Sequence, residues 1–305
     1  MKTGLRATAL VAFGMYSAAA MAADVSPQSF IGDKMRGTAG GVALRVSVAQ
    51  SEIKSDINPS NIAVATGGGL FGALLGAAID AGKAKKAEEL ITPLRNSLTG
   101  FDVDALAIDT AKAETADLSW VNATTPSFSK DTSAAGQSGF LDTINGDQLA
   151  LVTFSYDLSP DFSSIRVVEH ISIVHKGATN AQGAAIKPTD RLSYRNLDYN
   201  QSVTSVVTLA GSTNDKAANA ALWAADGAKR ARAVLTLGFG EVKRLTIRSL
   251  SLTPDNIKAM NSKENKRIVA GGFSGRQLAA EGTGTTTVWA PGFVSAQVLP
   301  DTVAQ

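Results

Sequence analysis

Apolar and polar side chains alternate along several stretches of the chain, and these stretches are expected to be strands. In residues 42–48 (VALRVSV) the apolar side chains occupy every second position, which is the period of a strand with one buried face. Residues 150–158 and 165–175 alternate in the same way, and a turn signal, Ser159-Pro160-Asp161, lies between them. They are therefore expected to pair as an antiparallel hairpin. Further strands are expected at 191–199, at 201–209 and between 288 and 298.

Other stretches repeat their apolar residues every three or four positions, which is the period of a helix. Within the first of these stretches, 84–98, Thr92-Pro93 predicts either a kink or a second helix with Thr92 as its cap and Pro93 in its first turn. Gly238 and Gly240 weaken the pattern in the middle of the last one. The helical stretches are 84–98, 103–118, 215–226 and 228–250.

The order of these elements favours an α+β fold with a largely antiparallel sheet, several helices, and a Gly/Ala-rich apolar helix or hairpin. Residues 119–147 are rich in Ser, Thr, Gly and Asn, and are expected to be a long loop or a soft boundary. A region with one strand, a glycine-rich segment and helices (23–118) then precedes a strand-rich α+β region (148–305). The two are expected as separate units or as parts of one domain.

The first 22 residues have the pattern of a cleavable secretory signal. Lys2 and Arg6 provide a basic start, residues 7–20 carry no charge, and Ala20-Met21-Ala22 matches the small-x-small pattern of a signal peptidase site. The apolar core is short for a membrane span, so an uncleaved anchor is the weaker alternative. The mature chain is expected in a bacterial periplasm or cell envelope.

Composition narrows the chemistry that the mature chain can perform. The 305 residues include no cysteine, which excludes disulfides, cysteine-bound zinc, thiol nucleophiles and a lipid-modified cysteine. The formal charge of +2 comes from Lys2 and Arg6, because the rest of the chain carries equal numbers of basic and acidic side chains. A neutral protein has no long-range field that attracts nucleic acid, so we expect no nucleic-acid partner.

The most unusual segment is an apolar, glycine-rich stretch at 62–79, with the sequence IAVATGGGLFGALLGAAI. Gly68, Gly72 and Gly76 follow one another at four-residue steps, so on a helix they lie along one face and allow another backbone to approach closely. At 1.5 Å per residue the stretch would span about 27 Å, slightly less than a hydrocarbon core of about 30 Å. The expected interaction residues are Gly68, Gly72, Gly76, Leu70, Phe71, Leu74, Leu75 and Ile79.

This step of glycines, followed by Lys83-Ala84-Lys85-Lys86-Ala87-Glu88, resembles the glycine-zipper segments of bacterial envelope proteins. The resemblance covers fewer than thirty residues and implies self-association, or contact with a membrane or an envelope partner, rather than a reaction. Many such proteins carry a lipid-modified cysteine, which this chain lacks. The alternative is a segment that packs tightly inside its own domain.

A nucleotide-binding interpretation of the same glycines is less favourable. Gly67-Gly68-Gly69-Leu70-Phe71-Gly72 satisfies GxGxxG, and residues 62–65 could form the preceding strand. The dinucleotide fold also needs a second strand that ends in an acidic residue about 20 residues further on, where this chain has a charged, helical pattern around Lys85. No Gly-Lys-Ser/Thr follows, which excludes a Walker-type loop. We therefore expect no cofactor.

Side chains that could perform catalysis are scattered. His170 and His175 lie five residues apart on one expected strand and so point to opposite faces, which prevents a shared metal or relay. Tyr194-Arg195-Asn196 and Tyr199 form either a recognition patch or the edge of a sheet, and no GxSxG motif is present. The three tryptophans, Trp120, Trp223 and Trp289, are expected in the core. No catalytic or metal-binding residue is predicted.

These observations favour an exported, non-enzymatic envelope protein. It would self-associate, or contact a membrane or an envelope partner, through the segment 62–79. The alternative is a soluble periplasmic ligand-binding module or hydrolase whose site is invisible in the sequence. A pocket lined by converging acids would favour that alternative.

Overall fold

The structure is a computed structural model that describes residues 30–31, 41–56, 70–118, 125–177, 185–187, 190–192, 197–262, 265–278 and 284–299. Within 70–80 it describes the backbone alone. The expected signal at 1–22, the first part of the glycine segment, Trp120 and Tyr194-Arg195-Asn196 lie outside the described residues.

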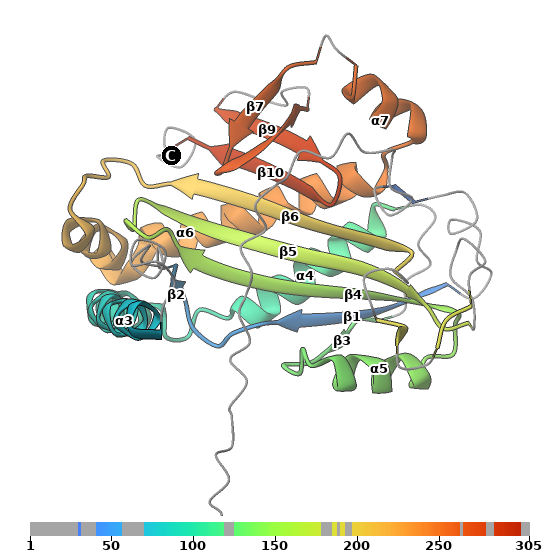
Figure 1. Cartoon of the computed structure of the whole chain (residues 1–305), viewed down its shortest axis with the longest axis horizontal. Coiled ribbons are helices and arrows are strands. Elements are labelled where there is room, and N and C mark those ends of the chain that lie inside the picture. The colour runs from blue at the N-terminus through green and yellow to red at the C-terminus, as the bar shows by residue number, and fades with distance from the viewer. Residues whose placement is uncertain are drawn as a thin grey trace, which may run out of the picture.

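The expected α+β class is confirmed, because a single mixed, mostly antiparallel sheet is combined with helices (Figure 1). The sheet has the order β3-β1-β4-β5-β6-β10-β9-β8-β7, and β2 pairs with β4 off this path. Its strands are β1 (Val42–Val48), β2 (Lys54–Ser55), β3 (Ser127–Phe128), β4 (Gln148–Leu158), β5 (Ser164–His175), β6 (Tyr199–Thr208), β7 (Arg267–Ala270), β8 (Phe273–Gln277), β9 (Thr285–Ala290) and β10 (Phe293–Val298).

The centre of the sheet contains the strands with the clearest alternation. β4 and β5 pair antiparallel along their whole length, as the turn signal between them predicts, and Val152 lies opposite Ile171. β1 lies parallel to β4 on the other side, with Val46 opposite Val152. The regions 23–118 and 148–305 thus contribute strands to one sheet.

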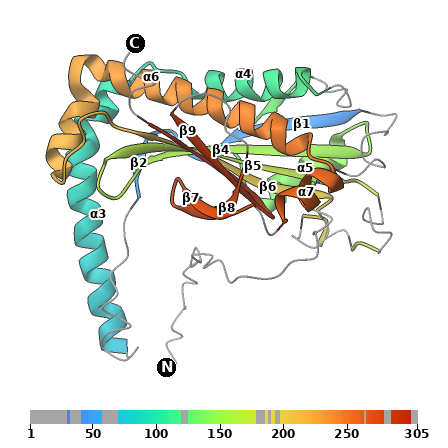
Figure 2. The ribbon, with the colours of Figure 1, turned by 90° about the horizontal axis from the view of Figure 1, so that it is seen from above.

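Five helices accompany the sheet in the described residues, namely α3 (Leu70–Leu98), α4 (Val103–Ala116), α5 (Ala134–Thr143), α6 (Lys216–Leu250) and α7 (Pro254–Met260). Figure 2 shows α4 and α6 side by side along one face of the sheet. α5 packs on the opposite face, where its Leu141 joins a small cluster with Leu149, Leu151 and Val174.

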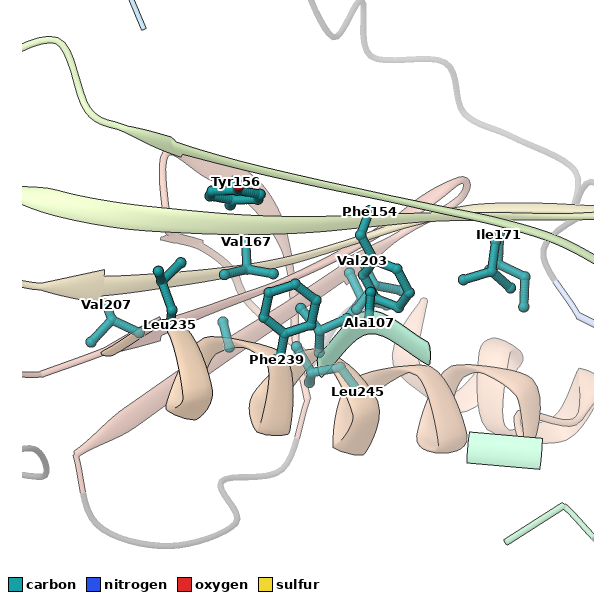
Figure 3. Packing of buried hydrophobic residues seen from close by; sticks show 14 of the residues in the cluster. Ala107, Phe154, Tyr156, Val167, Ile171, Val203, Val207, Leu235, Phe239 and Leu245 are labelled. Carbon is teal, nitrogen blue, oxygen red and sulfur yellow. The ribbon is translucent and has the colours of Figure 1, made fainter. Parts of the chain in front are cut away.

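The main core fills the space between the sheet and the two helices α4 and α6 (Figure 3). Phe154 of β4 and Phe239 of α6 meet there, with ring centroids 5.2 Å apart. Leu235 and Leu245 of α6 and Ala107 of α4 are all completely buried in the same layer. Burial of these apolar side chains, at roughly 25 cal/mol per Å² of apolar surface, is what holds the helices on the sheet.

α6 consists of two helical segments, as the sequence predicts. Residues between them leave the helical conformation, and three in succession have positive φ: Asp226 (53°), Gly227 (65°) and Ala228 (59°). Both segments contribute to the core, because Trp223 before the break and Ala231 after it are completely buried.

Of the two alternatives predicted at Thr92-Pro93, a second helix is excluded. α3 runs through Pro93, and the Thr92 hydroxyl donates to the Glu88 carbonyl one turn earlier instead of capping a new helix. The expectation of a long loop after α4 is wrong. Residues 119–147 are not a continuous loop, because they include β3 and α5. Ser133 caps α5 by accepting from the Gly136 N–H at 3.1 Å, and Leu141 supplies its buried contact.

The strand expected at 191–199 is also wrong in its described part. Residues 190–192 form a turn, and the strand begins only at Tyr199. The hairpin of β7 and β8 and the short helix α7 were not expected. They are short elements in which few apolar residues reveal a period.

Candidate functional site

The predicted interaction segment falls on the beginning of α3. Gly68 lies outside the described residues, whereas the other seven predicted residues belong to the first three turns of the helix. Figure 2 shows that this end of α3 extends away from the sheet and from the other helices, while the opposite end lies against α6. At 1.5 Å per residue, residues 70–79 account for about 15 Å of the projecting part.

The opposite end of α3 is fixed to the body by apolar and polar contacts. Ile91 and Leu94 are completely buried in the main core. Arg95 donates from Nε to the Ile53 carbonyl at 2.8 Å and forms an ion pair with Glu88 of its own helix. The helix is therefore held on the side toward its C-terminus.

Arg232 of α6 strengthens this attachment. Its guanidinium donates to the carbonyl oxygens of Ser97 and Thr99, where α3 ends, and lies 5.5 Å from the centre of the Phe101 ring. The last carbonyls of a helix have no partner within it, and a cation there also complements the helix dipole.

The surface directly after the glycine segment is polar and basic. Lys83, Lys85 and Lys86 are all exposed, as is Gly82, where a Cβ would meet nothing within 4 Å. This part of α3 thus remains open to solvent in the isolated chain. Among the helices that the structure describes, none is both long enough and apolar enough to cross a bilayer.

A second unusual feature, which the sequence analysis did not identify, is a pair of buried carboxyl groups. Glu114 of α4 is 2% exposed and Glu169 of β5 is completely buried. The two carboxyl groups are close enough for the charge of Glu169 to act on Glu114.

Polar groups of α6 and β6 surround the pair. The Thr246 hydroxyl donates to Glu169, and the Tyr199 hydroxyl pairs with that of Ser249 at 3.0 Å. Tyr199 is completely buried, so it belongs to the core and not to a recognition patch. Gln201, on the same face of β6, is also completely buried.

Burial is the main reason why both carboxyl groups hold their protons unusually tightly. It raises the pKa of Glu114 well above 4.5, and the neighbouring Glu169 charge raises it further, while Lys243 lowers it. Burial also raises the pKa of Glu169 to about 7, against the hydrogen bonds from Thr246 and Glu114, which lower it. Both carboxyl groups therefore lose their protons at a higher pH than an exposed glutamate does.

A small cavity of about 20 Å³ lies beside Glu114, between α4 and the strands β1, β4 and β5. Space of this size is about that of one water molecule. Converging acids were expected to favour a hydrolase or ligand-binding module, but this cavity admits no substrate. Its wall is otherwise formed by Val42, Leu44, Ala111, Thr115, Leu118, Ala150, Val152, Ile171, Ile173 and Leu250.

The remaining candidates behave as structural residues. His170 is exposed and His175 partly exposed, on opposite faces of β5. Trp223 and Trp289 are completely buried, which confirms their expected place in the core. In the described part of the chain, no group of three or more His, Asp or Glu side chains is placed to hold a metal ion.

The sequence does contain a signal for the carboxyl pair. Glu169 occupies an apolar position in the alternation of β5, between Val167 and Ile171, and Glu114 lies one turn after Ala111 on the buried face of α4. A charged residue at a core position needs a buried partner. Only the packing of α4 on the sheet identifies each as the partner of the other.

Comparison of the chain with protein-family models, curated proteins and solved structures finds no match. The geometry of the chain itself is therefore the basis for the functional argument.

Proposed function

We propose that this chain is an exported, non-enzymatic protein of the bacterial cell envelope that contacts another molecule through the glycine segment at 62–79. The observation that carries this proposal is the position of α3: its glycine-bearing beginning extends away from the body (Figure 2) while its other end is fixed. The molecule contacted is a second copy of the chain, an envelope partner or a membrane surface.

The physical argument concerns glycines in a helix. Each glycine weakens a helix interior by about 1 kcal/mol relative to alanine, so a projecting helix with Gly72 and Gly76 gains nothing from them by itself. The cost is offset when another surface packs on the glycine ridge, because the absence of side chains allows close backbone contact. The four-residue step thus supports a role in contact with another molecule.

The basic turn after the segment suggests how a membrane surface would participate. Lys85 and Lys86 are exposed on the helix directly beyond the apolar residues. Lysines at such a position are attracted to anionic headgroups by about 1 kcal/mol each close to the surface. Self-association needs no such attraction, so the two kinds of contact respond differently to lipid charge and salt.

The test replaces Gly72 and Gly76 with leucine in the full-length mature chain. The matched control is Gly82→Leu, which changes the same residue type on the same helix, outside the four-residue step and in open space. Leucine favours a helix more than glycine, so neither change weakens α3 itself. The oligomer mass is measured by light scattering, and membrane contact by sedimentation with anionic and neutral vesicles.

The proposal predicts that Gly72→Leu/Gly76→Leu lowers the oligomer mass or the vesicle-bound fraction, whereas Gly82→Leu behaves as wild type. An unchanged thermal midpoint in all three proteins shows that the body is intact. A double variant that matches wild type in both measurements refutes the proposal. Binding that depends on anionic lipid identifies the membrane, and a mass change without lipid identifies another copy of the chain.

A further inference from the structure

A glutamine without hydrogen-bond partners lies in the contact between α6 and the sheet. Gln201 of β6 is completely buried, and neither its Nε2 nor its Oε1 has a partner among the described residues. In the part of the chain that the structure describes, it is the one side chain that leaves both a donor and an acceptor unpaired. Buried polar groups of folded proteins are almost always paired with the protein or with ordered water, because an unpaired one loses its hydration without compensation.

Two polar contacts of α6 with the sheet flank this glutamine. Tyr199, two residues before Gln201 on the same face of β6, pairs its hydroxyl with that of Ser249 at 3.0 Å. Glu169 of the neighbouring strand β5 lies diagonally opposite Gln201 on the same face, and accepts from the Thr246 hydroxyl. Thr246 and Ser249 are three residues apart, so they lie on one face of α6. The amide of Gln201 therefore lies between two places where polar groups join the helix to the sheet.

The unpaired atoms at this place include a donor as well as acceptors. Nε2 of Gln201 donates, whereas its Oε1 and the unpartnered Oε1 of Glu169 accept. A bound cation would satisfy the oxygens alone and a bound anion the N–H groups alone, whereas water both donates and accepts. Diagonal neighbours on adjacent strands are about 7 Å apart, so two long side chains in these positions can share one bridging water.

The packing beside Gln201 leaves room for a molecule of this size. The cavity of about 20 Å³ is bordered by Ile171, which is directly opposite Gln201 in the register of β5 and β6. Leu250, the residue after Ser249, borders the same cavity. A space of this size is about that of one water molecule, and the last turns of α6 are thus not packed tightly against the sheet.

We propose that an ordered water molecule is bound at Gln201, beneath the last turns of α6, and connects its amide to the polar groups on either side. The water completes a row of paired groups that runs from Tyr199 and Ser249 to Thr246 and Glu169. Such a row fixes the position of α6 on β5 and β6, because any shift of the helix would leave one of these buried groups unpaired. The site is independent of the contact proposed for α3.

A crystal structure of the full-length mature chain, at a resolution that shows ordered water, tests the site directly. The expected result is a density peak within about 3.2 Å of the Gln201 amide and of one flanking polar group. A direct hydrogen bond between Gln201 and Glu169 overturns the proposal, as does an amide with no density beside it. The wild-type structure is decisive by itself, whether or not a variant folds.

A measurement in solution compares wild type with Gln201→Leu. Magnetic relaxation dispersion of the water oxygen counts the long-lived internal waters, and the variant should lose about one of them, since leucine offers no hydrogen bond. Gln297→Leu is the matched control, because the amide of Gln297 is already paired with the Thr208 hydroxyl at 2.6 Å. The control should keep the wild-type count. An equal count in wild type and Gln201→Leu overturns the proposal, and so does an equal loss in both variants.

Discussion

The position where α6 lies closest to the sheet provides a sharp test of the packing. A Cβ added at Gly238 would lie 2.7 Å from Cγ2 of Val167, which is too short for any real contact. Val167 is completely buried under the helix, and a β-branched side chain has few alternative rotamers. Gly240, two residues further along, is exposed, and a Cβ there would meet nothing within 4 Å.

The two alanine substitutions are therefore expected to have opposite effects. Gly240→Ala gains the helix propensity of alanine and should stabilise the fold by about 1 kcal/mol. Gly238→Ala gains the same amount, but the overlap with Val167 costs about 1–3 kcal/mol, as overpacking of a core does. We expect a net loss of about 1 kcal/mol, and so a difference of about 2 kcal/mol between the two variants.

Urea denaturation of both variants measures this difference, and each kcal/mol corresponds to about 2–4 °C in the thermal midpoint for chains of roughly this size. A double-mutant cycle with Val167→Ala isolates the contact, because removing the valine methyl groups should cost less in the Gly238→Ala variant than in wild type. If Gly238→Ala stabilises the protein as much as Gly240→Ala does, the close approach of α6 to β5 is refuted.

Three further predictions concern single contacts. Trp223→Phe removes the 2.8 Å hydrogen bond from Nε1 to the buried Phe162 carbonyl, and should lower the free energy of unfolding in urea by about 1–3 kcal/mol; a change below about 0.5 kcal/mol contradicts it. Arg232→Ala removes the hydrogen bonds to the last carbonyls of α3, and should lower the free energy of unfolding by about 1 kcal/mol and speed proteolysis at that end of the helix. Arg232→Lys is the control. Unchanged cleavage would be inconsistent with a role of Arg232 in attaching α3 to α6. Asp226→Gly should raise the thermal midpoint slightly, by the equivalent of about 0.5 kcal/mol, because this exposed residue has a φ of 53°; a lower midpoint argues against strain there.

Much of the fold follows from local periodicity. The apolar residues of β1, β4 and β5 alternate because one face of each strand lies on the main core. A strand that is long contains enough of these alternating residues for the pattern to be recognised. Helix α4 and the two parts of α6 were likewise evident from their spacing. Asp102, directly before the helical stretch predicted at 103–118, caps α4 by accepting from the Ala105 N–H at 2.8 Å.

Short elements were missed because their stability comes from contacts distant in sequence. Helix α5 has two glycines and few apolar residues, so its sequence resembles a loop. It forms because Ser133 caps it, and Leu141 packs on strands that are distant in the chain. Helix α3 also continues through Pro93 because of contacts that are distant in sequence: the buried Ile91 and Leu94, on either side of the proline, hold that part of the helix against the body.

The sequence by itself determined the long strands and helices of the core, the antiparallel pairing of β4 with β5, and the unusual glycine step before Lys83. These properties can be predicted from a local pattern because each of them depends mainly on residues that are neighbours in the sequence. Only the tertiary structure decided that Glu114 meets Glu169, that Gly238 is needed against Val167, and that the beginning of α3 projects from the body. Each of these depends on how elements far apart in the chain are placed relative to one another, which is set by the packing of the whole core.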